Sequence, residues 1–374
     1  MSDDIKKGLL GIVVDETQVS KVMPEINSLT YRGYAVQDLC KKCNFEEVAF
    51  LVLNGDLPKK NELKKFKKQL EDNRNITINL REIVKHMPKK AHPMDVTRTI
   101  VSVLGLEDKE TNDNSPKANM RKTIRIFAKT PTAIAAFFRA RKGKNVIPPK
   151  KNLSFSENFF YMCFGKVPQK EIVKAFDVSL ILYAEHSFNV STFTARTITS
   201  SLSDIHGAIT GAIASLKGPL HGGANEEVMH MMRKIKKPEN ALKWINDALK
   251  NKEVVMGFGH RVYKSGDSRV PTMREYFGKV AKIKKDKTFE KIYDIVEKVM
   301  IKKKNIHPNV DYPTGPTYHL MGFDTDFFTP IFVISRITGW SAHIMEQHAA
   351  NKLIRPLASY KGSKHRKVMQ LNQR

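Results

Sequence analysis

Apolar residues recur at intervals of three and four along most of the chain, and charged residues occupy the positions between them. This is the period of a surface α-helix with one face turned to the core. The segment NELKKFKKQLEDN (61–73), for example, places Leu63, Phe66 and Leu70 on one helical face. The pattern therefore predicts an all-α fold, in which helices supply nearly all of the regular structure.

The segments that lack the helical period are short. Within residues 9–34, the pieces GIVVDET and SLTYRGY have the composition of strands and predict a small N-terminal β-hairpin. Residues 108–118 are polar and predict a surface loop. Strands do not alternate with helices through glycine-rich turns, and this disfavours a parallel-sheet nucleotide-binding fold.

One helical segment, SLSDIHGAITGAIASLKGP (201–219), is unusually rich in small residues. Ser201 and Asp204 form its capping signal. Gly207 and Gly211 lie in its interior, where a glycine costs about 1 kcal/mol relative to alanine. Close approach of another helix would compensate that cost. The approaching helix belongs either to a second subunit or to the same chain, and both alternatives stay open at this point.

The chain is strongly basic, with a formal net charge of +26 and a pI near 9.8. Such a charge would suit a basic helical nucleic-acid-binding protein, which is the alternative reading of the chain. The lysines are spread over the whole sequence, however, and aromatic residues are not interleaved with them as a base-stacking surface would require. The charge therefore indicates a field that attracts an anionic substrate, and nucleic acid is not expected as a partner.

The three cysteines form an odd, sparse set that favours a reducing compartment. Cys40 and Cys43 make a lone CxxC, which predicts two partly buried helix residues and no zinc site, because no second pair accompanies it. No apolar run approaches the roughly 18 residues of a membrane span. The start MSDDIKKGLL resembles neither a signal nor a transit peptide. We therefore expect a cytoplasmic protein without a membrane partner.

Four segments combine histidine, arginine or aspartate with glycine, proline or small polar residues, as functional loops often do. They are AEHSFNVSTFTAR with His186, KGPLHGGANEE with His221, MGFGHRVYKSGDSR with His260, and HPNVDYPTGPTYH with Asp311. Glycines adjoin His221 and His260. Glycine lets a ligand approach the backbone closely, so these two histidines are the better candidates for chemistry.

These residue types suit one kind of reaction. A neutral imidazole donates a hydrogen bond to a carbonyl, a carboxylate accepts a proton, and an arginine binds a carboxylate through two hydrogen bonds. Together they suit proton abstraction next to a carbonyl in a site that binds a dicarboxylate. The same side chains would also fit a metal site, but they lack the short spacing of typical ligands. A serine hydrolase would need a G-x-S-x-G turn, which is missing.

A resemblance to the citrate synthase family runs through nearly the whole chain. It is carried, in order, by LTYRGYAVQDL, FEEVAFLVLNGDLP, HPMDVTRT, LYAEHSFNVSTFTAR, GPLHGGANEE, NKEVVMGFGHRVY, FTPIFVISRITGWSAHIMEQ and NKLIRP. The combination of GPLHGGAN, GFGHRVY and PNVD at these intervals is highly specific. The chain is most similar to the compact bacterial forms, which include 2-methylcitrate synthases. The segment YPTGPTYH departs from the family's pattern, in which an aromatic–serine segment is usual.

The resemblance implies a catalytic role for three residues. His221 resembles the histidine that hydrogen-bonds the thioester carbonyl and stabilises its enol. Asp311 resembles the base that removes the α-proton, and His260 resembles the group that polarises the ketone of oxaloacetate and protonates the new alkoxide. The expected reaction is condensation of acetyl-CoA or propionyl-CoA with oxaloacetate, followed by thioester hydrolysis that releases CoA.

The resemblance also implies a binding set. His186, Arg269, Arg336 and Arg355 resemble the residues that bind oxaloacetate, with Arg355 reaching the site of a neighbouring subunit. Lys264 aligns with a basic position that contacts a CoA phosphate. Arg336 has independent support, because it interrupts the apolar run IFVISRITGW, where an unpaired charge is costly. The alternative for Arg336 is an ion pair with an acid in the core.

The implied architecture is a two-domain helical homodimer with sites shared across the interface. Residues 1–222 and 323–374 would form the large domain, and residues 223–322 an inserted small domain. Closure of the two domains on oxaloacetate would exclude water and complete the acyl-CoA site. No metal and no other cofactor is expected, since acyl-CoA is a substrate.

Overall fold

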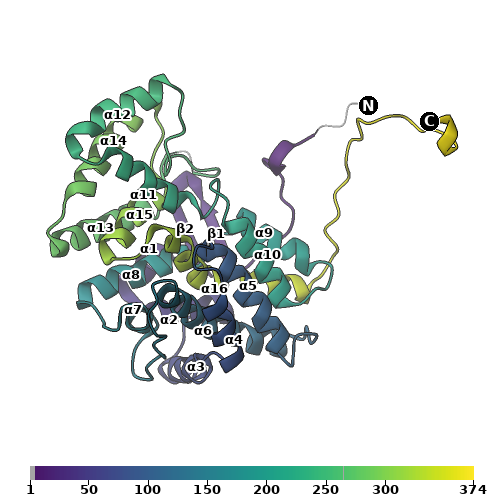
Figure 1. The fold of residues 1–374 in the computed structure, drawn as a ribbon, viewed down its shortest axis with the longest axis horizontal. Helices are drawn as coiled ribbons and strands as arrows, with labels where there is room; N and C mark the ends of the chain where they lie inside the picture. The colour runs from purple at the N-terminus through teal and green to yellow at the C-terminus, as the bar shows by residue number, and fades with distance from the viewer. Residues whose placement is uncertain (1–4, 264) are drawn as a thin grey trace.

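The computed structural model describes residues 5–263 and 265–374. Within these ranges the chain forms α-helices and one small antiparallel sheet, so the predicted all-α class is confirmed (Figure 1). The helices are α1 (Val36–Lys42), α2 (Phe45–Asn54), α3 (Lys60–Asn73), α4 (Ile78–His86), α5 (Pro93–Glu107), α6 (Pro116–Ala140), α7 (Phe155–Phe164), α8 (Lys170–Tyr183), α9 (Val190–Thr199), α10 (Ile205–Leu216), α11 (Ala224–Ile235), α12 (Pro238–Lys250), α13 (Val270–Lys284), α14 (Thr288–Lys304), α15 (Asp311–Met321) and α16 (Phe328–Ala349).

Helix α16 forms the centre of the larger group of helices. Its side chains are buried on nearly all sides, so other elements must surround it. Helices α2, α6, α8, α9 and α10 pack against it, and Figure 1 shows it enclosed between them. Trp340 and Arg336, both in α16, are among the largest fully buried side chains. A charged residue therefore stands in the middle of the core.

Helices α11 to α15 gather at one side of the molecule, at the upper left of Figure 1. There α15 packs against α11 and α13, and α12 packs against α14. Helix α13 also contacts α8, so this smaller group rests on the larger one. All five helices fall within residues 223–322, the segment expected to form an inserted domain, and that division remains a prediction.

The predicted N-terminal hairpin is present, but one of its two proposed segments is wrong. Strand β1 (Ser20–Met23) pairs with β2 (Ser28–Tyr31), and β2 pairs with the short β3 (Tyr34–Ala35). The segment SLTYRGY thus supplies β2 and the turn into β3, whereas GIVVDET forms no strand. The chain instead reverses after β1 at Asn27, whose left-handed backbone (φ 47°) makes a tight turn. Val13 in GIVVDET is 89% exposed, so this apolar piece has no sheet to join.

The sheet also fixes the segment that follows α8. The hydroxyl of Tyr31 in β2 lies 3.0 Å from the main-chain carbonyl oxygens of both Ile181 and Glu185, where it donates a hydrogen bond. Ser20 in β1 donates from its hydroxyl to the Glu185 carboxylate and accepts from the main-chain N–H of Ser187 (2.9 Å each). Residues 185–187, which include His186, are therefore held from both sides.

The glycine-rich helix α10 is capped at Asp204, which accepts hydrogen bonds from the N–H groups of His206 and Gly207. Its close neighbour is in the same chain. A Cβ atom added to Gly211 would lie 2.2 Å from Cδ1 of Ile198 in α9. A contact within the chain therefore explains Gly211, and this glycine offers no support for a subunit interface.

Candidate active site

His221 lies on a tight turn between α10 and α11. A Cβ atom on Gly222 would come within 2.5 Å of the Leu216 side chain, and one on Gly223 within 2.7 Å of the Lys217 carbonyl oxygen. Only glycine fits such approaches without a shift of the backbone. The two glycines therefore allow the chain to fold back immediately after α10 and present the His221 ring to the interior.

The protonation state of His221 follows from its hydrogen bonds. The main-chain N–H of Ser191 donates to Nε2 of His221 (3.2 Å), so Nε2 carries no proton and the neutral ring carries its proton on Nδ1. Burial, reinforced by the charges of Arg336 and Arg269, lowers the pKa of His221 to about 3. The ring is therefore neutral near pH 7 and offers an N–H donor at Nδ1.

His260 lies on a loop with two left-handed glycines, Gly257 (φ 82°) and Gly259 (φ 81°). The main-chain N–H groups of Val262 and Tyr263 donate to its Nδ1 at 3.0 and 3.1 Å. These two bonds fix the ring, and in its neutral form they leave the proton on Nε2. His260 thus donates from Nε2, whereas His221 donates from Nδ1.

A short backbone pairing joins the His260 loop to the segment that leads into α15. Gly259 donates from its N–H to the carbonyl of His307 (2.8 Å), and Asn309 donates to the carbonyl of Gly257 (2.9 Å). The Asn309 side chain adds a bond to the Gly259 carbonyl (3.0 Å). Because Asp311 follows two residues after Asn309, this pairing brings His260 and Asp311 to the same place.

Asp311 is the first residue of α15, where the helix dipole favours a carboxylate. Its Oδ1 accepts a hydrogen bond from the hydroxyl of Tyr183, the last residue of α8, at 2.6 Å. Burial nevertheless raises the pKa of Asp311 to about 6. A carboxylate with a raised pKa is a stronger base than an exposed one, and this one is still mostly ionised near pH 7.

Arg269 is buried and held by Asp267, a residue that the sequence-based prediction missed. Nε and Nη2 of Arg269 donate to the two carboxylate oxygens of Asp267 at 2.9 and 2.7 Å. Burial raises the pKa of Asp267, but the Arg269 charge outweighs it and keeps that pKa below its ordinary value. Asp267 also accepts from the N–H of Val310 (3.0 Å), so it ties Arg269 to the start of α15.

Arg336 is 1% exposed and lies in the middle of α16. Its Nε donates to the main-chain carbonyl of Tyr183 (2.6 Å), and the guanidinium lies 4.7 Å from the centre of the Phe332 ring. Within residues 5–263 and 265–374 its Nη1 has no hydrogen-bond partner and its charge has no ion pair, so the alternative of a core ion pair is not met. Burial lowers the pKa of Arg336 to about 10, which still leaves it charged at neutral pH.

His186 completes the cluster. Its ring centre is 5.1 Å from that of His260, and its buried Nε2 has no hydrogen-bond partner among the described residues. Burial, followed by the charges of Arg269 and His260, holds the pKa of His186 well below its ordinary value. A neutral ring and the Arg336 Nη1 thus present two buried polar groups that a bound polar molecule would satisfy.

Six of the predicted residues therefore form one cluster. Beside burial, which is the largest influence, the charges of both Arg269 and Arg336 lower the pKa values of His186, His221 and Asp311. His260 belongs to the same cluster through its contact with the His186 ring. The predicted His, Arg and Asp segments, which are far apart in the sequence, thus meet at one place.

Of the two other predicted residues, only Arg355 belongs to the described part of the chain. Arg355 is exposed, on the C-terminal segment that leaves the body of the molecule after α16 (Figure 1). The structure does not bring it to the cluster within one chain. Lys264, the predicted CoA-phosphate contact, lies outside the described residues.

Glu185, like Asp267, is a buried acid that the sequence analysis did not single out. It is fully buried next to His186, and its Oε1 is 2.9 Å from both the Ser20 hydroxyl and Nε2 of His343. Burial raises the pKa of Glu185, but the His343 and Arg336 charges outweigh it and keep the pKa below its ordinary value. Glu185 is therefore a buried carboxylate next to the cluster that partly offsets the Arg336 charge.

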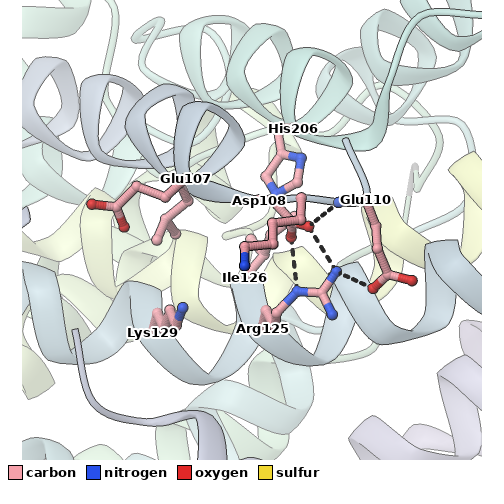
Figure 2. Close-up of a pocket in the computed structure, with 9 residues that line it drawn as sticks. Glu107, Asp108, Glu110, Arg125, Ile126, Lys129 and His206 are labelled. Carbon is pink, nitrogen blue, oxygen red and sulfur yellow. Dashed lines mark hydrogen bonds and ion pairs between the residues drawn. The ribbon is translucent and has the colours of Figure 1, made fainter. Parts of the chain in front are cut away.

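A separate cavity of about 420 Å³ lies between α5, α6 and α10, away from this cluster (Figure 2). Arg125 donates from Nε and Nη2 to the Asp108 carboxylate at 2.8 Å each, and it pairs with Glu110 at 2.7 Å. These ion pairs anchor the predicted loop 108–118, whose last residues form the first turn of α6. The charged lining of the cavity is thus largely engaged in holding this loop.

Metal ligands, free thiols and apolar helices are considered for residues 5–263 and 265–374. No set of three or more His, Cys, Asp or Glu side chains there is grouped to hold a metal ion. Cys40 is buried in α1 and Cys43 follows that helix, each with a free thiol. Helices that combine the length and the apolarity needed to cross a bilayer are also absent from this part of the chain.

The cluster has the chemistry of enolisation next to a carbonyl. It combines the neutral imidazole of His221, the oriented imidazole of His260, a carboxylate of raised pKa and two buried guanidiniums. Such donors stabilise negative charge that develops on carbonyl oxygens while the carboxylate takes a proton. The guanidiniums suit a substrate that carries carboxylates.

Comparison with known proteins agrees with this chemistry. The family model described as "Citrate synthase, C-terminal domain" matches residues 8–357. The chain is 51% identical to a citrate synthase of Mycolicibacterium smegmatis over 365 residues, covering 98% of this chain and 97% of the relative. It is 52% identical to a 2-methylcitrate synthase of Mycobacterium tuberculosis H37Rv over 363 residues, with coverage of 97% and 92%.

Solved structures give the same result. The chain is similar to a citrate synthase from the archaeon Thermoplasma acidophilum, solved in a ternary complex with carboxymethyl coenzyme A and oxaloacetate. The TM-score is 0.94 at 31% identity, and the match covers 99% of this chain and 100% of that one. A citrate synthase from Thermotoga maritima matches with a TM-score of 0.91 at 35% identity, over 99% of both chains.

Proposed function

Because the chain belongs to the citrate synthase family, we propose that it condenses a short acyl-CoA with oxaloacetate and then hydrolyses the thioester to release CoA. The observation that carries this proposal is the pair of oriented histidines, His221 and His260, fixed beside a carboxylate of raised pKa. Neither the structure nor the relatives support the alternative of a nucleic-acid-binding protein.

The first step is removal of a proton from the carbon next to the thioester carbonyl. Asp311 takes this proton, and the Nδ1–H of His221 donates to the thioester oxygen as it gains negative charge. The α-proton of a thioester is a very weak acid, so the base alone would be insufficient. Neutral His221 is the suitable donor, since its low pKa makes the remaining N–H a stabiliser rather than a source of a full proton.

The second step joins the two substrates. The enol carbon attacks the ketone carbon of oxaloacetate, the thioester carbonyl re-forms, and the ketone oxygen takes the Nε2 proton of His260 and becomes the hydroxyl of the product. The water that attacks the thioester in the next step returns a proton to His260. Water then cleaves the resulting thioester, which gives the tricarboxylate and free CoA. Arg269, Arg336 and His186 bind the oxaloacetate carboxylates, as supported by the unpartnered Arg336 Nη1 and His186 Nε2.

We extend the proposal to a homodimer with shared sites. Within one chain, Asp267 offsets Arg269 and Glu185 partly offsets Arg336, so little net positive charge is left for a dianion. A cation from a second copy of the chain would add the positive charge that a dianion needs, and the exposed Arg355 is the candidate. The N-terminal segment and the C-terminal segment that carries Arg355 both expose large apolar residues, such as Val13 (89% exposed) and Leu357 (88%). This exposure supports the proposal that a second copy covers both segments.

A mixing experiment tests the shared site. Asp311→Ala and Arg355→Ala chains are each expected to be nearly inactive alone and to regain activity together. Each mixed dimer holds one site with both residues intact, so random exchange should restore about a quarter of the wild-type activity per chain. CoA release is measured after exchange is verified by mass spectrometry of the intact dimers. Full exchange without recovered activity would assign Arg355 to some other role.

The reaction itself is tested by oxaloacetate-dependent release of free CoA thiol from both acetyl-CoA and propionyl-CoA. One extra methylene in an apolar pocket is worth about 1–3 kcal/mol, so we expect activity with both and a preference within about two orders of magnitude. The measurement is kcat/KM for each thioester at saturating oxaloacetate. A larger ratio would assign the enzyme to one acyl chain, and no release from either would refute the proposed function.

The remaining parts of the proposal concern the domains and CoA. Residues 223–322 would move as a small domain against the rest of the chain, and closure would bring the His260 loop and Asp311 onto a bound oxaloacetate. Lys264 would contact a CoA phosphate, in keeping with the net charge of +26. The proposed condensation uses no metal and no prosthetic group, because Asp311 and His260 carry its proton transfers.

A further inference from the structure

Tyr183 donates the one side-chain hydrogen bond to the Asp311 carboxylate found in the described part of the chain. It is the last residue of α8, and it is fully buried. Its hydroxyl donates to Oδ1 of Asp311 at 2.6 Å, which is short for a bond of this kind and typical of a charged acceptor. The two residues belong to different groups of helices, so the bond spans the boundary between them.

Three contacts fix the position of the Tyr183 side chain. Its ring is stacked on Phe332, with ring centres 3.8 Å apart and planes 27° from parallel. Its main-chain carbonyl, at the end of α8, has no partner within the helix and accepts from Nε of Arg336 at 2.6 Å. The hydroxyl is the third contact. A tyrosine held at both ends cannot follow Asp311 if the carboxylate rotates, and so it selects one orientation of that carboxylate.

We propose that Tyr183 is a positioning residue for the base: its hydroxyl holds Oδ1 of Asp311 in one orientation and directs Oδ2 at the proton to be removed. This inference rests on the proposed function, in which Asp311 removes the α-proton. A carboxylate oxygen that accepts a short hydrogen bond is the weaker base of the two, so the other oxygen is the better acceptor for the proton.

The charged groups around Asp311 explain why this hydrogen bond matters. Arg269 and Asp267 approach from the segment before α13, and Arg336 approaches from α16. Burial raises the pKa of Asp311, and the Tyr183 hydrogen bond is the strongest of the influences that lower it. Arg269 and Arg336 also lower it, but both are already engaged, with Asp267 and with the Tyr183 carbonyl. Loss of the Tyr183 hydroxyl should therefore let burial raise the pKa of Asp311 further.

The test is Tyr183→Phe in the full-length protein, which removes one oxygen and keeps the stacked ring. The carboxylate must be ionised to act as a base, so kcat/KM for the acyl-CoA rises with pH through the pKa of Asp311. Without the hydroxyl this acid limb should move upward by about one pH unit or more, the equivalent of about 1.4 kcal/mol lost from a hydrogen bond to a charged group. Activity should recover toward the wild-type value at high pH.

Tyr318→Phe is the matched control. Tyr318 is also buried, on α15, and its hydroxyl bonds to the Ser179 hydroxyl on α8 at 2.9 Å. This variant also loses a buried hydroxyl that joins α8 to α15, but the Tyr318 hydroxyl bonds to Ser179 and not to Asp311. Its acid limb should stay where the wild-type limb lies.

Each outcome has one meaning. A Tyr183→Phe profile that is lowered equally at every pH, with its acid limb unmoved, would overturn the positioning role. A wild-type enzyme without oxaloacetate-dependent CoA release would overturn the proposed function instead. If Tyr183→Phe does not fold, 3-fluorotyrosine placed at position 183 replaces it, because its more acidic hydroxyl is a stronger donor. The acid limb should then move to lower pH, and a limb that stays in place would again count against the proposal.

Discussion

Replacing Asp311 with asparagine is expected to abolish condensation while oxaloacetate still binds. Asparagine keeps the shape of the side chain and can still accept from the Tyr183 hydroxyl, but it cannot take a proton at neutral pH. Loss of a general base lowers the rate by about 10²–10⁴-fold, and the weak acidity of the thioester puts this site at the upper end. Turnover is measured as CoA release at saturating concentrations of both substrates.

Binding is followed separately through tryptophan fluorescence. Trp340 donates from its indole N–H to the Ser191 hydroxyl, the group that also contacts His221, so it lies close enough to report on the occupied site. Asp294→Asn is the control, since it removes a carboxylate that pairs with Arg274 on the surface of α14. An Asp311→Asn enzyme with near-normal turnover would show that another group is the base.

Replacing Arg336 with methionine is expected to remove oxaloacetate binding without unfolding the protein. Truncating one partner of a buried, hydrogen-bonded charge pair costs about 2–5 kcal/mol, so kcat/KM for oxaloacetate should fall between about 30-fold and a few thousand-fold. The free energy of unfolding should stay the same or rise, because an apolar side chain of similar size replaces a buried charge that lacks an ion pair within the described residues.

Arg74→Met is the matched comparison. Arg74 is 7% exposed and donates to the main-chain carbonyl of Leu153 at 3.0 Å, so it too is a buried guanidinium held by a carbonyl. It has no contact with the cluster, and its replacement should leave kcat/KM for oxaloacetate unchanged. Urea unfolding and steady-state kinetics are measured on both variants. A large loss of stability in Arg336→Met with unchanged kinetics would make Arg336 a structural residue.

The signals for the catalytic loops were local, and this is why the sequence revealed them. His221 and His260 stand beside glycines that the turns require, and Arg336 interrupts an apolar run. Asp267 and Tyr183 carry no such signal. An aspartate among polar loop residues and a tyrosine at the end of an apolar helix look ordinary, and their importance comes from contacts with residues far away in the sequence.

The incorrect strand assignment has a related cause. GIVVDET has a composition typical of strands, but a strand forms only where a second strand supplies hydrogen bonds to its edge. The available edge, that of Ser28–Tyr31, pairs with Ser20–Met23, because the left-handed turn at Asn27 brings these two segments side by side. The geometry of the turn at Asn27 determined which strands pair, and this geometry could not be predicted from a single sequence.

Helix α16 is the centre of the larger group of helices and also the last α-helix within residues 5–263 and 265–374. A ribosome makes it after every element that packs around it. Helices α2, α6, α8, α9 and α10 therefore leave the ribosome with apolar faces that have no permanent cover, and the bond between the Gln18 N–H and the Glu346 carboxylate must wait until nearly the whole chain exists. Premature termination anywhere before Phe328 would release a polypeptide without its core, a ready target for chaperones and proteases.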